Sequence, residues 1–77
     1  MMLAIEGRGT DRISRVIGGI GAVRAIHSTI GKWDLIVELG AETLEVLDQV
    51  LSDIRRLDGV TASETNLMLR TKLAATA

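Results

Sequence analysis

Two side chains of this 77-residue sequence, His27 and Asp34, are candidates for acid–base chemistry. His27 is the single histidine and has no clustered partner in the sequence, so a structural or interface role is favoured over a metal-ligating or catalytic one. The chain contains no cysteine, which excludes disulfides, the common Cys/His zinc sites and the Cys-x-x-Cys loop of copper chaperones. Because no nucleophile–base constellation is visible, we expect no catalytic residue, no metal site and no cofactor.

Two glycine-rich segments are further candidates, because glycine loops can cradle phosphates. Residues 7–10 (Gly-Arg-Gly-Thr) lack the Gly-Lys-Ser/Thr ending of a phosphate-binding loop. Residues 19–21 (Gly-Ile-Gly) follow an expected helix rather than a strand, which is the wrong context for a dinucleotide-binding fingerprint. We interpret both segments as structural turns.

The charge balance narrows the range of partners. Lys and Arg total 9 and Asp and Glu total 10, a net charge of −1, whereas a domain that binds phosphate backbones normally carries a basic excess. Trp33 is the single aromatic residue, so a stacking platform for bases is absent. No apolar run approaches the roughly 18 residues of a membrane span, and residues 1–5 are too short for a signal-peptide core. We expect a cytoplasmic protein that contacts neither nucleic acid nor membrane directly.

The hydrophobic pattern divides the chain at its glycines into strands and helices. In chain order, we expect a strand over 1–5, a helix over about 10–20, strands over 22–30 and 32–39, a helix over 44–57, and a strand from 60 to about 69. This order predicts a ferredoxin-like βαββαβ fold of the α+β class. Right-handed crossovers then place both helices on one face of a four-stranded antiparallel sheet. A single domain spans 1–77, with 70–77 expected to be a flexible tail.

Particular residues are expected to end or join these elements. The Thr10 hydroxyl can cap the first helix, and the glycines within 18–21 favour a left-handed exit from it. Gly31 followed by Lys32 has the sequence form of a tight type II′ hairpin turn between the two middle strands. Gly59 is the expected left-handed stop after the second helix.

The two faces of the expected sheet lead to a prediction of self-association. One row of the strand over 32–39 should face the core, namely Trp33, Leu35, Val37 and Leu39. The other face should still carry apolar side chains, from Ile36, Ile26, Leu67 and Leu69. A chain of this length buries only about 60% of its unfolded surface, and a bare apolar face on it would be an exposed patch. Without disulfides or metals to stabilise the chain, we expect it to dimerise through the sheet.

Residues 31–37 (Gly-Lys-Trp-Asp-Leu-Ile-Val) carry a more specific pattern. The segment resembles the Gly-x-aromatic-Asp-hydrophobic signature in the effector domain, or RAM domain, of the Lrp/AsnC (feast/famine) transcription regulators. Residues 23–27 (Val-Arg-Ala-Ile-His) are similar to the second strand of that domain, and residues 54–60 and 63–65 resemble its helix end and last strand. The resemblance covers almost the whole chain in the right order.

This resemblance implies a domain that senses and assembles and is not an enzyme. In that family the domain dimerises through its sheets, the dimers form rings or larger assemblies, and small effectors, commonly amino acids, bind between dimers. Full regulators carry a helix-turn-helix domain ahead of this one, whereas here nothing precedes Met1, so the chain resembles the stand-alone members. We expect a higher homo-oligomer, an octamer, and full-length regulators of the family as further partners.

The resemblance also assigns an effector pocket, to Thr29, Gly31, Trp33, Asp34, Ser63 and Thr65. The turn at Gly31 exposes backbone amides that can bind a carboxylate, while Asp34 can pair with an ammonium group. Hydroxyls at Ser63 and Thr65 can bond either end of an amino acid. Directly before the glycine the family tends to place a small polar residue such as threonine, whereas this chain has Ile30 there and a threonine one step earlier.

Each of these side chains also has a structural interpretation. Asp34 can end the hairpin by bonding neighbouring backbone amides, the common role of an aspartate in a turn. Trp33 can pack in the core, and Ser63 and Thr65 can be ordinary strand residues.

Three functions therefore remain open. The leading hypothesis is a ligand-sensing and oligomerisation domain. The second, motivated by Ile30, is a structural partner that co-assembles with full-length regulators and binds no ligand. The third is a small ferredoxin-like enzyme that would use His27 and Asp34, although fold alone does not imply chemistry.

Overall fold

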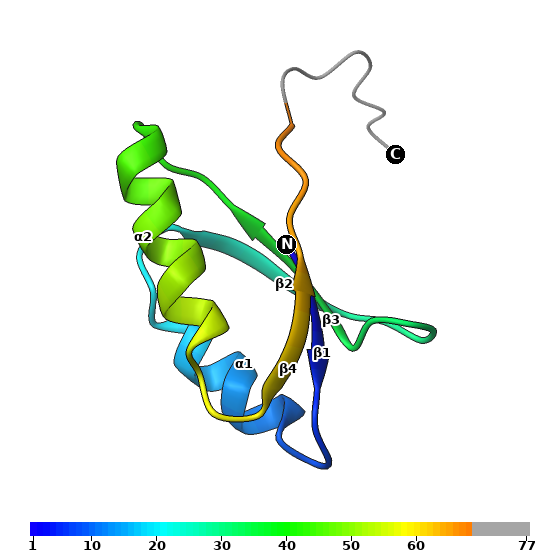
Figure 1. Ribbon diagram of the computed structural model, residues 1–77. Helices are drawn as coiled ribbons and strands as arrows, with labels where there is room; N and C mark the ends of the chain where they lie inside the picture. Colours follow the sequence, from blue (N-terminus) through cyan, green and yellow to red (C-terminus); the bar gives the residue numbers. More distant parts are fainter. Residues whose placement is uncertain (69–77) are drawn as a thin grey trace.

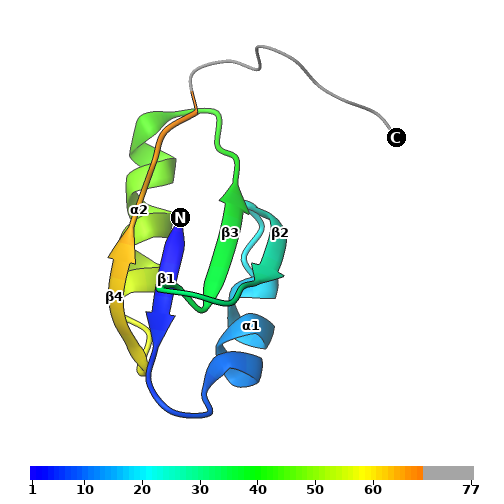
Figure 2. The same ribbon diagram turned by 90° about the vertical axis from the view of Figure 1, so that its right-hand side faces the viewer.

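The computed structural model describes residues 1–68 and shows an antiparallel sheet with two helices on one face (Figure 1). In chain order the elements are β1 (Met2–Ile5), α1 (Thr10–Gly18), β2 (Val23–Ser28), β3 (Leu35–Leu39), α2 (Leu44–Arg55) and β4 (Val60–Glu64). Figure 2 shows the sheet from the face that the helices leave uncovered, with the strand order β2-β3-β1-β4. The predicted ferredoxin-like α+β fold is confirmed.

The core lies between the sheet and the helices. Its buried side chains are Leu3, Ile5, Ile13, Ile17, Leu35, Val37, Val50, Leu51 and Ile54. In β1 and β3 they lie two residues apart, and in the helices mainly three or four apart, so each element turns one face inward. The predicted inward row of β3 is thus confirmed for Leu35 and Val37. Within residues 1–68 no polar or charged side chain is buried.

Two apolar side chains lie elsewhere than predicted. Ile26 stands opposite Val37 in the β2–β3 ladder and packs against the core, so it belongs to the helix-covered face and not to the uncovered one. Trp33 precedes β3 and lies in the loop before it, so it does not extend the inward row. Ile36 does lie on the uncovered face, where 38% of it is exposed.

The last strand is shorter than predicted. β4 ends at Glu64, which stands opposite Met2, the first residue of β1. Beyond this pair β1 offers no further partner, so the ladder stops and residues 65–68 form no regular element. Leu67 therefore lies beyond the sheet as an exposed side chain, and both Leu69 and the tail predicted over 70–77 lie outside the described residues.

The ends of α1 differ from the prediction in both position and conformation. Gly9 is the N-cap residue and its carbonyl accepts from Ile13 N–H at 2.9 Å, so Thr10 is already helical and makes no cap hydrogen bond. At the other end Gly19 has a φ of −82°, which is right-handed. Its N–H donates to Val16 O at 3.2 Å, so a tight turn continues the helical hand and the predicted left-handed exit is wrong.

α2 begins as a well-capped helix. Thr43 is its N-cap, and the Thr43 Oγ1 accepts from Val46 N–H at 3.1 Å. The helix ends at Arg55, before Leu57, and its C-cap Arg56 is right-handed. The predicted stop at Gly59 is therefore wrong. Gly59 has a positive φ of 102°, but it lies in the turn that leads into β4.

The connection between β2 and β3 is wider than a tight hairpin. The β2–β3 ladder ends with Ser28 opposite Leu35, so residues 29–34 form a loop and the predicted type II′ turn is wrong. Gly31 does have a positive φ, 138°, but at the tip of this loop. Thr29 and Asp34 close the base of this loop, with Thr29 N–H donating to Asp34 O at 3.1 Å.

Candidate functional site

The loop over 29–34 brings together four of the predicted site residues, Thr29, Gly31, Trp33 and Asp34. It projects from the sheet on the side opposite the helices (Figure 1). Inside the loop, Thr29 Oγ1 donates to Trp33 O at 2.7 Å. Together with the backbone bond from Thr29 to Asp34, this fixes the loop at its base.

Asp34 ties the loop to the middle of the sheet. Its N–H donates to Leu3 O at 2.8 Å, and its Oδ2 accepts from Ile5 N–H at 2.7 Å. The carboxylate thus takes the place of a strand carbonyl beside the end of β1, which supports the structural interpretation of this residue. A carboxylate accepts several hydrogen bonds, so this contact leaves acceptor capacity for a ligand.

The tip of the loop is open and carries mixed chemistry. A Cβ at Gly31 would meet nothing within 4 Å, and Ile30 is fully exposed. Lys32 Nζ lies 5.3 Å from the centroid of the half-buried Trp33 ring, a cation–π contact that places a positive charge beside the loop.

The structure does not bring Ser63 and Thr65 to this loop. Ser63 stands opposite Leu3 in the β1–β4 ladder, so its half-buried side chain lies on the helix-covered face. Thr65 follows the end of β4, beside the start of β1, whereas Asp34 lies at the end of β1. Within one copy Thr65 and the loop therefore lie at opposite ends of the central strand, and Ser63 lies on the far side of Leu3 from Asp34.

A groove that sequence reasoning missed lies at the Thr65 end. It has a volume of about 430 Å³ and runs between α2, the end of β3 and residues 65–68; we call it the α2–β3 groove. Its walls include Met1, Glu38, Leu47, Leu51, Thr65 and Met68. The helical spacing placed the two leucines in the core stripe, and no local pattern indicates that segments so distant in sequence leave a hollow between them.

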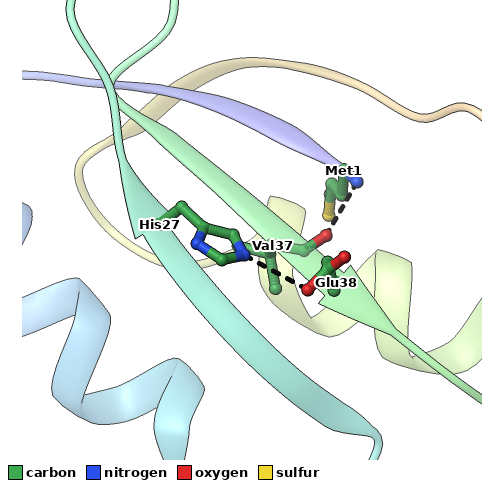
Figure 3. Close-up of polar contacts among 4 residues, drawn as sticks. All are labelled: Met1, His27, Val37 and Glu38. Atoms are coloured by element: carbon green, nitrogen blue, oxygen red, sulfur yellow. Dashed lines mark hydrogen bonds and ion pairs between the residues drawn. The ribbon is translucent and has the colours of Figure 1, made fainter. Parts of the chain in front are cut away.

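His27 and Glu38 are in polar contact on the uncovered face of the sheet (Figure 3). His27 stands opposite Ile36, and its Nε2 lies 3.2 Å from Glu38 Oε2, with both side chains about half exposed. This contact is an ion pair only when the imidazole is protonated. Since His27 contacts Glu38 while Asp34 contacts the backbone of β1, the two candidate acid–base residues are engaged separately.

The amino group of Met1 is held against β3. It donates to Val37 O at 2.9 Å (Figure 3). Val37 N–H donates back to Met1 O at 2.7 Å. Desolvation on burial lowers the pKa of this amine below its usual value of 8.0, and the nearby Glu38 carboxylate partly opposes that shift.

Residues 1–68 contain neither a cluster of metal-ligating side chains nor a membrane-spanning helix. No group of three or more His, Cys, Asp or Glu side chains there is placed to hold a metal ion. Neither helix in that part of the chain has the length and apolar character needed to cross a bilayer.

Comparison with known proteins relates the chain to a protein family and to a transcriptional regulator. The model of a protein family described as "Lrp/AsnC ligand binding domain" matches residues 1–77. The HTH-type transcriptional regulator LysM of Saccharolobus solfataricus is 27% identical over 62 residues, a match that covers 80% of this chain and 44% of that relative. The chain thus spans less than half the length of this regulator.

Proposed function

The chain belongs to the Lrp/AsnC ligand binding domain family, as residues 31–37 predicted, and from this membership we propose that it binds a small effector and couples that binding to self-assembly. The family is one of regulatory ligand-binding domains and not a class of enzymes. We propose an amino acid as the effector, because the site offers both a carboxylate and backbone amides.

The observation that carries this proposal is the anchored loop over 29–34. Its base is fixed by the Thr29–Trp33 and Asp34–Ile5 hydrogen bonds, so Gly31 and Asp34 are held close together before any ligand arrives. Preorganisation of this kind lowers the entropic cost of binding. Thr29, Gly31, Trp33 and Asp34 would form one half of the pocket, and Ser63 and Thr65 would complete it from a neighbouring copy.

We further propose that copies dimerise through the uncovered face of the sheet. Ile36 is exposed at its centre, and Met2 and Ala4 lie on the same face because they alternate with the buried residues of β1. Dimers would then assemble further, to an octamer. Full-length regulators are proposed as co-assembly partners in the cytoplasm, since the relative that this chain matches in part is an HTH-type transcriptional regulator.

A second candidate function is structural co-assembly without an effector. It is supported by the Ile5 amide, which already engages the Asp34 carboxylate, and by the fully exposed apolar Ile30 beside Gly31. We propose no catalytic role, because His27 and Asp34 have separate partners and form no acid–base pair.

Isothermal titration with a panel of amino acids tests the leading proposal against the second one. Asp34→Asn is the informative variant, since an amide oxygen can still accept from Ile5 N–H while the charge that would pair with an ammonium is lost. We expect at least tenfold weaker binding for Asp34→Asn, and unchanged binding for the control Asp48→Asn on the exposed side of α2. No heat with any amino acid, together with an unchanged light-scattering mass, would favour the purely structural function.

The sheet interface has its own test. Ile36→Asp places a charge at the centre of the uncovered face and should convert dimers to monomers in size-exclusion chromatography with light scattering. Val16→Asp alters an exposed apolar residue on α1 and should leave the mass unchanged. A native chain that stays monomeric at high micromolar concentration would contradict the proposed dimer.

A further inference from the structure

We infer that Ile30 of one copy inserts into the α2–β3 groove of a second copy, reciprocally, when two sheets face each other. This inference rests on the proposed sheet dimer and adds a specific contact to it. It joins the most exposed large apolar side chain of residues 1–68 with an apolar hollow that those residues leave unfilled.

The loop has the properties of an inserting element. Ile30 is fully exposed beside the open tip at Gly31. The loop that carries both residues projects on the side of the sheet where the second copy is proposed to lie (Figure 1). Asp34 and Thr29 fix the base of the loop through their hydrogen bonds, so little conformational freedom remains to be lost on docking.

The groove has matching properties. Leu47 and Leu51 of α2, with Met1 and Met68, supply apolar walls for a branched aliphatic side chain. Glu38 also lines the groove, and its register in the β2–β3 ladder places it on the uncovered face, so the groove is reached from the side of the proposed partner.

Charge and position favour a second copy as the occupant. Lys32 lies two residues after Ile30, and a docked loop would bring its ammonium towards Glu38. The loop lies at the Ile5 end of β1, whereas the groove lies at the Met1 end. A two-fold axis perpendicular to the strands exchanges these ends, so each loop meets the groove of the other copy in one closed, isologous interface.

This arrangement also brings the loop residues of the proposed effector pocket to Thr65, one of the two residues proposed to complete it. Thr65 is one wall of the groove, so the Ile30 contact would carry Gly31 and Asp34 of one copy to the threonine of the other. Ile30, which stands where the family tends to place a small polar residue, would then position the two sides of the pocket relative to each other.

Disulfide trapping tests the contact, because the native chain has no cysteine. Ile30→Cys and Leu47→Cys chains carrying different mass tags would be mixed, oxidised and analysed by intact mass without reductant. We expect a disulfide-linked dimer that contains one copy of each chain. Two controls should give little disulfide-linked dimer: Ile30→Cys alone, and Val16→Cys mixed with Leu47→Cys. Self-linked Ile30→Cys, or no mixed product while light scattering still shows a dimer, would overturn the inference and leave the sheet dimer standing.

A measurement without added cysteines provides the second test. Ile30→Ser should weaken dimerisation at least tenfold, whereas Val16→Ser should change it less than twofold. Lys32→Glu and Glu38→Lys should each weaken the dimer several-fold, and the chain with both changes should regain most of the loss. An Ile30→Ser chain that dimerises as tightly as the native one contradicts the inserted side chain, whereas a monomeric native chain contradicts the proposed dimer itself.

Discussion

The Asp34 carboxylate accepts a hydrogen bond from the Ile5 amide at 2.7 Å, across 29 positions of the sequence. A side chain of the candidate site thus completes the hydrogen bonding of the central strand. Because the same residue supports the fold and is proposed to contact the effector, its two roles have to be separated by substitution.

Asp34→Ala should lower the free energy of unfolding by about 1–3 kcal/mol, because it leaves the partly buried Ile5 N–H without its acceptor. Asp34→Asn keeps a side-chain oxygen and should cost less than about 1 kcal/mol. Urea denaturation followed by far-UV circular dichroism measures both, with Asp48→Ala as an exposed control. An Asp34→Ala loss no larger than that of the exposed control would show that this hydrogen bond contributes little.

Two glycine substitutions should change stability in opposite directions. Gly59 has a φ of 102°, and an added Cβ would lie 3.1 Å from Ile13 Cδ1, so Gly59→Ala should destabilise the fold by roughly 1–3 kcal/mol. Gly18 is the last residue of α1 and has open space around it, so Gly18→Ala should stabilise by about 0.4–1 kcal/mol. Thermal melts of both variants and of the native chain measure these changes in stability. A Gly59→Ala variant more stable than the native chain would contradict the expected strain.

Alanine substitution of two threonines compares a helix cap that the structure shows, Thr43, with one that was expected only from the sequence, Thr10. Thr43→Ala removes the acceptor of Val46 N–H at the start of α2 and should cost about 1 kcal/mol. Thr10→Ala removes no cap hydrogen bond and should change the unfolding free energy by less than about 0.5 kcal/mol. If chemical denaturation gave the larger loss for Thr10, the assigned start of α1 would be wrong.

The Met1 amine should make stability depend on pH. Its pKa is lower in the folded chain than its usual 8.0, so between these two values the unfolded state binds more protons than the folded state. The unfolding free energy should therefore rise as the pH increases towards 8 and level off above it. Denaturation between pH 6.5 and pH 9 in a His27→Gln background isolates the amine, and acetylation of that amine should abolish the slope. A slope that survives acetylation must come from another group.

The strands and helices were predictable because their signals are local. Alternation placed Leu35 and Val37 on the inward row of β3, and the spacing of Val50 and Ile54 identified α2. The turns were less predictable. The tight turn expected at Gly31 is replaced by a loop whose base is fixed by a hydrogen bond to β1, and no local pattern contains such a contact.

The candidate site was also predictable only where its signals are local in the sequence. Residues 31–37 indicated the family but predicted a tight turn where the structure has a loop. The structural alternative for Asp34 anticipated a bond to a backbone amide, but to a neighbouring one and not to the distant Ile5. Sequence order gave no indication that Ser63 and Thr65 lie away from the loop, because that separation follows from the antiparallel register of β1 and β4. The groove escaped prediction for the same reason, since its walls come from distant segments.

The strand order also constrains how the chain reaches its native state. β1 lies in the middle of the sheet, yet both of its partners follow it in the chain, with Met2 opposite Ile36 on one side and Glu64 on the other. The β2–β3 hairpin closes a short loop, whereas fixing β1 on both sides requires a much longer closure that includes β4. During refolding, the amide protons of β1 should acquire protection from solvent exchange after those of β2, so the β2–β3 hairpin would become ordered before β1 and β4 join it.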